Sequence, residues 1–239
     1  MSSAMLHAVE AMPRNQSREP LADAAAAEAA RYAVLRRLGS AIRHQIAGAL
    51  QPVGMMATLL ERRLKAPEPS MESLRRNSGE LSTLSRAASA ECVALMGWLA
   101  PREDEAVPLA AGVHECLHLM ATELSFRGFS VADMTLQVQA EVSRPALRAV
   151  LPAALMALTD AAPSPAEVRI DARSADGTAV ELELALLPQQ GEPPPPAKAY
   201  RPIAWPDVQA LAQAEGVGLE CTGDRVVLRF AYQPRGAVN

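Results

Sequence analysis

Residues 43–56 of this 239-residue chain are RHQIAGALQPVGMM. Around this stretch, apolar residues recur every three or four positions, which is the spacing of one face of an α-helix. These residues are Leu35, Leu38, Ile42, Ile46, Ala49, Val53, Met56 and Leu60. Because each residue turns a helix by about 100°, His44 points about 200° away from both Ile42 and Ile46. The spacing therefore predicts a long amphipathic helix that carries His44 on its polar side.

A second helical pattern follows the first after a short break. The sequence APEPS at residues 66–70 places two prolines between the helices, and apolar residues then recur at helical spacing through residues 74–99. Two long helices with a short turn predict an antiparallel hairpin at residues 21–101, after a flexible leader at residues 1–20. A lone hairpin cannot cover its whole apolar stripe, and pairing with a second copy would make a four-helix bundle. We therefore expect a homodimer.

The pattern changes in residues 102–239, where helical and strand-like stretches alternate, and this predicts an α+β domain. The expected helices are residues 109–127, 147–161 and 205–216, and the expected strands are residues 135–142, 168–173, 179–187 and 225–233. The sequence SADG between the second and third of these strands has the turn chemistry of a hairpin. A proline-rich connector, GEPPPPAKAYRP, precedes the last helix.

The composition limits the classes of partner. Hydrophobic residues make up 49% of the chain, which is enough for a real core. The formal net charge of −4 argues against a strongly basic nucleic-acid-binding surface. Cys92, Cys116 and Cys221 form no CxxC pair and are expected to be small core residues in a reducing compartment. No stretch has the roughly 18 apolar residues of a membrane span, so we expect a cytoplasmic protein that binds neither nucleic acid nor membrane.

The sequence HQIAGALQP at residues 44–52 resembles the phosphoacceptor box of two-component histidine kinases, in variants of the type HDLRGALSP. The positions that keep the spacing of this box are His44, Ile46, Gly48, Ala49, Leu50 and Pro52. A helical hairpin followed by an α+β half is also the family's order, and the resemblance covers about residues 30–232. It implies a dimerisation and histidine-phosphotransfer hairpin that forms a dimeric four-helix bundle, followed by an ATPase-like α/β sandwich, with His44 as the phosphoacceptor.

The chain departs from this family at positions that the kinase reaction needs. Gln45 stands where the family usually has an acidic base, and an amide cannot take up a proton. Ala153 and Ala157 stand where the family has asparagines, one of which holds magnesium. The glycine-rich nucleotide loops are replaced by LPQQGEPPPP and YRPIAWPDV. The resemblance therefore implies a degenerate ATPase-like domain that binds no ATP and has no cofactor of its own.

The leading hypothesis is a histidine phosphotransferase of a phosphorelay. His44 would take a phosphoryl group from the aspartate of one response-regulator receiver domain and pass it to another, while the receiver supplies the magnesium. The residues expected to help dock the receiver are Arg36, Arg37, Arg43, Gln45 and Gly48. The alternative is a non-catalytic pseudo-histidine-kinase adaptor that binds a response regulator or sensor kinase. An active kinase with a reorganised ATP site is the least favoured hypothesis.

Two further patterns favour a structural interpretation. His114 and His118 lie one helical turn apart, a spacing that two metal ligands on a helix can have. However, no further ligand lies nearby and Cys116 falls on the other side, so ordinary surface histidines are the better interpretation. The two glycines of GVGLE, residues 216–220, are more typical of a helix end that leads into a strand than of a phosphate-binding loop.

Overall fold

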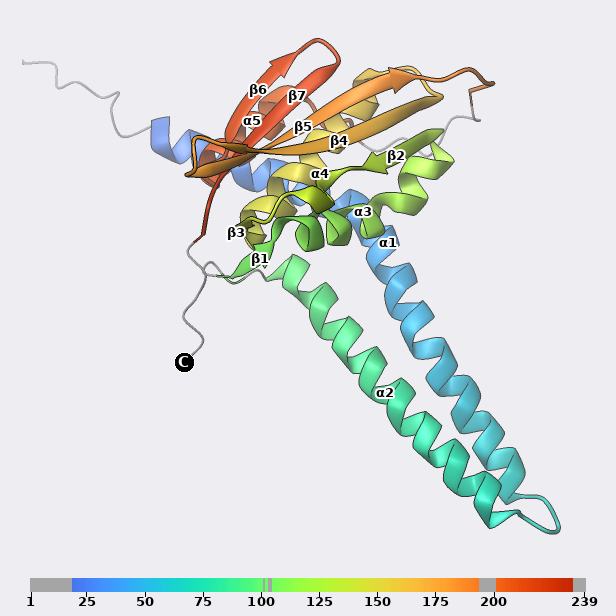
Figure 1. Cartoon of the computed structure of the whole chain (residues 1–239). Helices are drawn as coiled ribbons and strands as arrows, with labels where there is room; N and C mark the ends of the chain where they lie inside the picture. Colours follow the sequence, from blue (N-terminus) through green and yellow to red (C-terminus); the bar gives the residue numbers. More distant parts are fainter. Residues whose placement is uncertain (1–18, 101, 103–104, 194–200, 234–239) are drawn as a thin grey trace, which may run out of the picture.

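The computed structural model describes residues 19–100, 102, 105–193 and 201–233. Its first two elements are α1 (Glu19–Leu64) and α2 (Met71–Leu99). They form the antiparallel hairpin that the sequence predicts, and this hairpin projects from the rest of the molecule (Figure 1). The expected leader lies outside the described residues except at its end, where Glu19 and Pro20 already belong to α1.

The remaining elements form a domain with one layer of helices against a sheet, and we refer to it as the sandwich domain. These elements are β1 (Ala106–Pro108), α3 (Leu109–Phe126), β2 (Phe129–Asp133), the 3-10 helix η1 (Thr135–Gln137), β3 (Glu141–Ser143), α4 (Arg144–Ala161), β4 (Ala166–Ala175), β5 (Ala179–Pro188), α5 (Trp205–Ala214), β6 (Gly218–Thr222) and β7 (Arg225–Ala231). The strand order of the main sheet is β2-β4-β5-β7-β6. Strands β2 and β4 are parallel and the other neighbours are antiparallel, while β1 pairs with β3 separately. The fold is α+β, as the sequence predicts.

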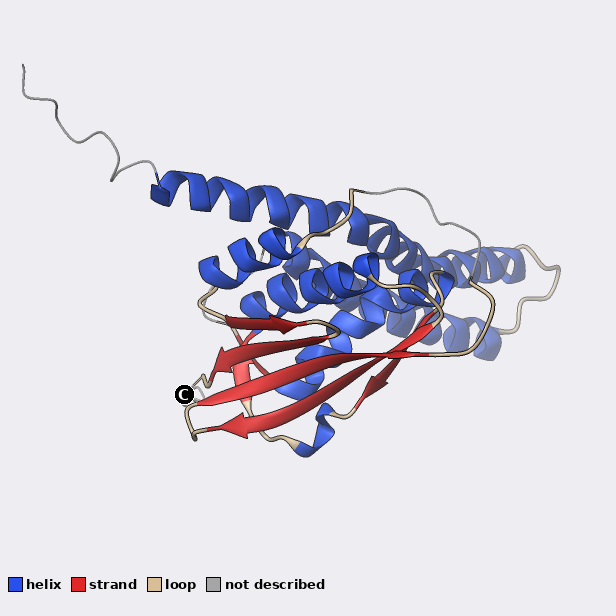
Figure 2. Cartoon of the chain, turned by 90° about the horizontal axis from the view of Figure 1, so that it is seen from above, coloured by secondary structure: helices blue, strands red, loops and turns tan. Residues whose placement is uncertain are grey.

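The alternation along the strands explains how the sheet meets its helices. Residues at every second position of the central strands are buried, as Ile170 in β4, Leu184 in β5 and Leu228 in β7 illustrate. Successive side chains of a strand point to opposite faces, so these residues share the face that α3, α4 and α5 cover. Figure 2 shows the helices together on that one face of the sheet.

The strand predicted at residues 135–142 is wrong. Thr135–Gln137 is the 3-10 helix η1, and only Glu141–Ser143 forms a short strand. The cause is Asp133, whose carboxylate accepts hydrogen bonds from the Thr135 backbone nitrogen at 2.9 Å and from the Thr135 hydroxyl at 2.7 Å. Such a turn competes with an extended backbone. The neighbouring edge strand β2 (Phe129–Asp133) was not predicted.

The first half of α1 belongs to the core of the sandwich domain rather than to the hairpin alone. Ala30, Val34 and Leu38 are buried in the same apolar cluster as the interior of the sandwich domain. An ion pair of 2.5 Å between Arg31 and Glu215 also ties α1 to the residue just after α5. The segment predicted as one hairpin unit, residues 21–101, thus contributes to two parts of the molecule. Figure 2 shows this half of α1 running along the helical layer.

None of the described helices combines the length and the hydropathy that crossing a bilayer requires.

Candidate functional site

His44 lies near the middle of α1, where this helix leaves the sandwich domain and continues as the hairpin. Its side chain is exposed, whereas Ile42 is buried and Ile46 is half-buried. This is the orientation that the helical spacing predicts. The imidazole is therefore open to a partner that approaches from solvent.

Beyond His44, toward the turn of the hairpin, α1 has no bulky side chain at Gly48 and carries a largely apolar hollow. Gly48 lies one turn after His44, and a Cβ atom added at Gly48 would meet nothing within 4 Å. Further along α1 is a shallow hollow lined by Gln51, Gly54, Met55, Thr58, Leu59 and Arg62. At about 100° per residue, Met55 and Arg62 lie within about 20° of the direction of His44. The hollow and the imidazole therefore lie along one side of α1.

Four of the five residues expected to help docking remain accessible around His44. Arg36, Arg43 and Gly48 are exposed, and Gln45 is half-buried. Arg36 and Arg43 lie about 80° and 100° around α1 from His44 in the same direction, so both are to one side of the imidazole. The candidate site therefore has positive charge on one side and the open backbone of Gly48 one turn further along α1.

Arg37 is placed differently, and its assignment to a docking surface is corrected here. Its side chain is only 5% exposed. Its guanidinium donates hydrogen bonds to Glu123, with one nitrogen–oxygen distance of 3.1 Å, and to Asp160 at 2.5 Å. Burial opposes the charge, but these hydrogen bonds and charges outweigh it and raise the pKa of Arg37. Arg37 therefore joins α1 to α3 and α4 and offers nothing to a partner.

The sandwich domain presents apolar residues where the family resemblance places polar ligands. Ala153 and Ala157 on α4 are buried among apolar side chains. Within the described ranges, no group of three or more histidine, cysteine, aspartate or glutamate residues is arranged to hold a metal ion. The exposed rings of His114 and His118 stack with centroids 6.2 Å apart. Cys116 faces the core, and burial raises the pKa of its thiol.

Sequence reasoning missed Arg148 on α4. Its side chain is 8% exposed, lies 5.0 Å from the ring centroid of Trp98 on α2, and donates a hydrogen bond of 2.9 Å to Glu115 on α3. The available signal was that Arg148 is the one charged residue in the interior of α4, because the other two, Arg144 and Asp160, lie at its ends. A buried charge needs partners, so this pattern could have indicated a contact between domains.

No protein-family model matches the sequence, and no curated protein matches it. The similar solved structures include a histidine kinase from Burkholderia phymatum, with 18% identity over 82% of this chain and 97% of that chain and a TM-score of 0.40. A second is a bacterial phosphotransferase, with 15% identity over 82% of this chain and 95% of that chain and a TM-score of 0.34. A third is the histidine kinase ThkA in complex with the response regulator TrrA, with 15% identity over 94% of this chain and 67% of that chain and a TM-score of 0.39. Each likeness extends over most of this chain with few identical residues.

Proposed function

We propose that this protein is a histidine phosphotransferase that relays a phosphoryl group between receiver-domain aspartates through His44. The observation that carries the proposal is the exposed imidazole of His44 on a helical hairpin, within a sequence that resembles a phosphoacceptor box. An exposed nucleophile in this setting needs a phosphorylated partner and no bound nucleotide.

The chemistry requires little from the rest of the chain. A neutral imidazole nitrogen attacks the phosphorus of an aspartyl phosphate while the phosphorus–oxygen bond to the aspartate breaks and its electron pair returns to the carboxylate. The other ring nitrogen can lose its proton to solvent, which leaves a phosphohistidine with an uncharged ring and an anionic phosphoryl group. A glutamine at position 45 is compatible with this step, because the aspartyl phosphate is already activated and no base is needed to prepare the imidazole for attack on ATP. The receiver would hold the magnesium ion.

The surface around His44 supports docking of a receiver domain. The hollow beside Met55 and Leu59 offers apolar area on the side of His44, and the bare backbone at Gly48 allows close approach. The exposed guanidinium groups of Arg36 and Arg43 would favour an acidic partner. With Arg37 removed from this set, the proposed docking residues are Arg36, Arg43, Gln45 and Gly48.

A homodimer is part of the proposal, and the exposed apolar residues of the hairpin support it. Leu50 on α1 is 49% exposed and Met96 on α2 is 64% exposed. Met96 lies about 200° around α2 from Trp98, and Leu50 lies about 140° around α1 from Arg37. Because Trp98 and Arg37 face the sandwich domain, Leu50 and Met96 face away from it. A second copy that covers this side would complete a four-helix bundle and leave both His44 residues accessible.

We also propose that the protein does not bind ATP, and the argument comes from two residues of α4. Ala153 and Ala157 have no atoms that could ligate magnesium or a phosphate, and both are buried. We expect no heat of binding when ATP and magnesium are titrated into the protein in a calorimeter. Micromolar affinity in that titration would contradict the proposal.

The deciding experiment is phosphoryl transfer from isolated receiver domains labelled with radioactive acetyl phosphate. The wild-type chain should acquire acid-labile label, and the His44→Ala variant should acquire none while it keeps the wild-type circular dichroism. Label on the variant would assign the chemistry to another residue. Binding of a receiver to both forms without any label would instead support the adaptor hypothesis.

A further inference from the structure

Arg37 is the buried centre of a partly buried ion network between α1 and the sandwich domain. Besides Arg37, the carboxylate of Asp160 accepts hydrogen bonds from the Ile203 backbone nitrogen at 2.9 Å and forms an ion pair of 2.8 Å with Arg127. Arg127 in turn donates a hydrogen bond of 2.9 Å to the carbonyl oxygen of Thr159. The network thus connects α1 with α3, α4 and the segment before α5. Two guanidinium groups and two carboxylates balance each other there, which a buried network requires.

Arg148 makes a second connection, this time to α2. It is held between the indole of Trp98 and the carboxylate of Glu115, so that α2, α3 and α4 meet at one side chain. The fit at this point is close, because a Cβ atom added at Gly97 would lie 2.7 Å from a guanidinium nitrogen of Arg148. Each helix of the hairpin is therefore fastened to the sandwich domain at its own point. Two separated points leave only rotation about the line that joins them, and the apolar packing of the first half of α1 opposes that rotation.

The position of Arg37 relates this joint to His44. Seven residues separate them, which corresponds to a rise of about 10 Å and a difference in direction of about 20° around α1. Arg37 thus marks the edge of the packed face of α1 that is nearest to His44, because the buried residues Ala30, Val34 and Leu38 lie about 40–120° around α1 from the direction of His44. A sandwich domain that tilted about the buried first half of α1 toward this edge would approach His44 and compete with a docking partner.

We propose that Arg37 and Arg148 form a rigid two-point joint that holds the sandwich domain clear of His44. Arg37 is then a positioning residue, which acts on the candidate site by fixing the domain beside it. Buried ion networks contribute little net stability compared with apolar packing, but they demand one geometry. The inference rests on the proposed function only for its consequence for phosphoryl transfer.

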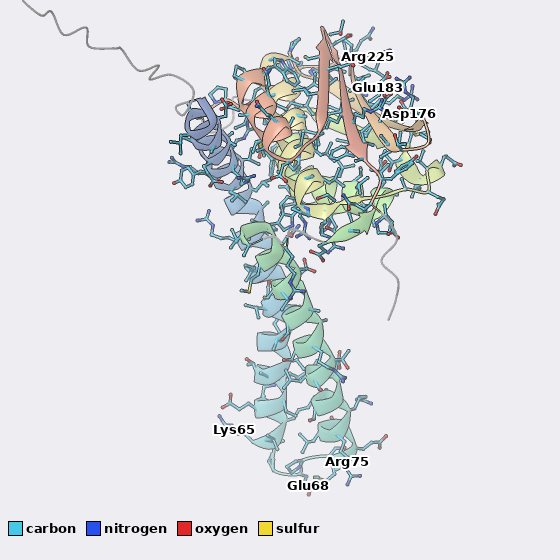
Figure 3. All side chains as sticks on the ribbon, turned by 90° about the vertical axis from the view of Figure 1, so that its left-hand side faces the viewer. Lys65, Glu68, Arg75, Asp176, Glu183 and Arg225 are labelled. Atoms are coloured by element: carbon cyan, nitrogen blue, oxygen red, sulfur yellow. The ribbon has the colours of Figure 1, made fainter. Side chains whose placement is uncertain are left out.

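Distances between two spin labels measured by pulsed electron paramagnetic resonance test the joint directly. One label is attached to native Cys221, which is exposed on β6, and the other to a Thr83→Cys variant on the exposed surface of α2. Cys92 is replaced by serine, while Cys116 is fully buried and keeps its thiol from the reagent. Labelled chains are diluted with unlabelled chains so that a dimer carries one labelled pair. Figure 3 shows that the hairpin turn, marked by Lys65 and Arg75, and the sheet, marked by Arg225, lie at opposite ends of the molecule.

The wild-type chain should give one narrow distance distribution, and so should the control Arg36→Met, which changes the exposed neighbour of Arg37. The double variant Arg37→Met/Arg148→Met should broaden the distribution about twofold or more, because the domain is then held to the hairpin only by the apolar packing of the first half of α1 and can tilt about it. The double variant Arg37→Lys/Arg148→Lys should fall between them, since lysine keeps the charge but loses the fork of donors. A broad distribution in the wild type, or a wild-type width in the folded methionine variant, would overturn the proposal. If the methionine variant does not fold, the lysine variant decides in the same way.

A second measurement separates this inference from the proposed function. In the methionine variant, the receiver concentration that gives half-maximal labelling should rise about fivefold, while the rate at saturating receiver stays within about twofold, because covering His44 competes with docking. Arg169→Met, on the exposed face of the sheet, is the control that should change neither quantity. An unchanged half-maximal concentration alongside a broadened distance distribution would overturn the proposed shielding of His44. If the wild type accepts no label, the proposed function fails while the distance measurement still decides the joint.

Discussion

Helices α2 and α4 show how differently the two parts of this molecule use their side chains. Of the 29 residues of α2, five are buried, whereas 13 of the 18 residues of α4 are buried. Helix α4 is enclosed by the sheet and by its neighbouring helices, and the first half of α1 completes the core around it. The hairpin leaves long apolar side chains such as Met71, Val93 and Met96 in solvent. The core of the sandwich domain is thus closed with the help of α1, whereas the rest of the hairpin leaves apolar surface exposed, which agrees with the proposed dimer.

The largest expected effect tests the enclosed helix. Leu155 is fully buried at the centre of α4, so Leu155→Asp would place an unpaired carboxylate in the core. We expect a loss of more than about 4 kcal/mol in the free energy of unfolding, measured by urea denaturation followed by circular dichroism. A loss below about 1 kcal/mol would mean that α4 is less enclosed than the structure describes.

The next effect tests whether the hairpin is covered by a second copy. The double variant Leu50→Glu/Met96→Glu places like charges on the exposed side that faces away from the sandwich domain. We expect the dimer to weaken by about 100-fold, which corresponds to about 2.7 kcal/mol, as measured by sedimentation across a dilution series.

The matched control for the dimer is Met55→Glu, which adds the same charge on the side of His44. It should leave the dissociation constant of the dimer unchanged. Equal weakening by both changes would contradict the assignment of the dimer contact to the side of Leu50 and Met96. A wild-type chain that is monomeric at all concentrations would contradict the proposed dimer itself.

Two glycines compare the tightness of packing in the sandwich domain with that in the hairpin, and the expected effects are smaller. A Cβ atom at Gly112 in α3 would lie 2.5 Å from Leu147 and 2.9 Å from Val107, whereas one at Gly79 in α2 would meet nothing within 4 Å. Gly112→Ala should therefore cost about 1–3 kcal/mol by overpacking, and Gly79→Ala should gain about 0.5–1 kcal/mol through helix propensity. Thermal unfolding of the two variants measures both values. Changes of the same sign would contradict the difference in packing.

Local patterns in the sequence predicted most of the fold, because its elements are long and regular. The helical spacing through α1 and α2 gave the hairpin and the exposed direction of His44. The alternation of β4 and β5 about SADG gave the central hairpin of the sheet. The strand expected at residues 135–142 was wrong because its apolar alternation coincides with a side-chain turn at Asp133, which local hydrophobicity does not encode.

The burial of Arg37 could not be predicted from its neighbours in sequence. Its partners Glu123 and Asp160 lie 86 and 123 residues away, and only the packing of the whole sandwich domain brings them to α1. An arginine on an amphipathic helix is usually solvated, so the docking interpretation followed the local pattern. The roles of His44, Arg36, Arg43, Gln45 and Gly48 rest on the motif and their accessibility, and they remain predictions.

The smallest effect concerns a surface contact of the sandwich domain, at the start of α5. It tests how much such a contact contributes to stability compared with the enclosed core around α4. Asp207 accepts a hydrogen bond of 2.9 Å from the Ala204 backbone nitrogen at the start of α5 and one of 2.7 Å from Arg201. Partial burial opposes ionisation of this carboxyl, but the hydrogen bonds from Arg201 and Ala204 outweigh it and lower the pKa of Asp207. A lowered pKa in the folded state means that the ionised form contributes stability above the unfolded pKa, near 4, and that this contribution is lost as the pH falls through the folded pKa. Because the site is near the surface, we expect Asp207→Asn to cost only about 0.5 kcal/mol near pH 7. The difference in the free energy of unfolding between wild type and variant should shrink toward zero below about pH 3. A difference that does not depend on pH would show that the contact stabilises through packing rather than through the charge of Asp207.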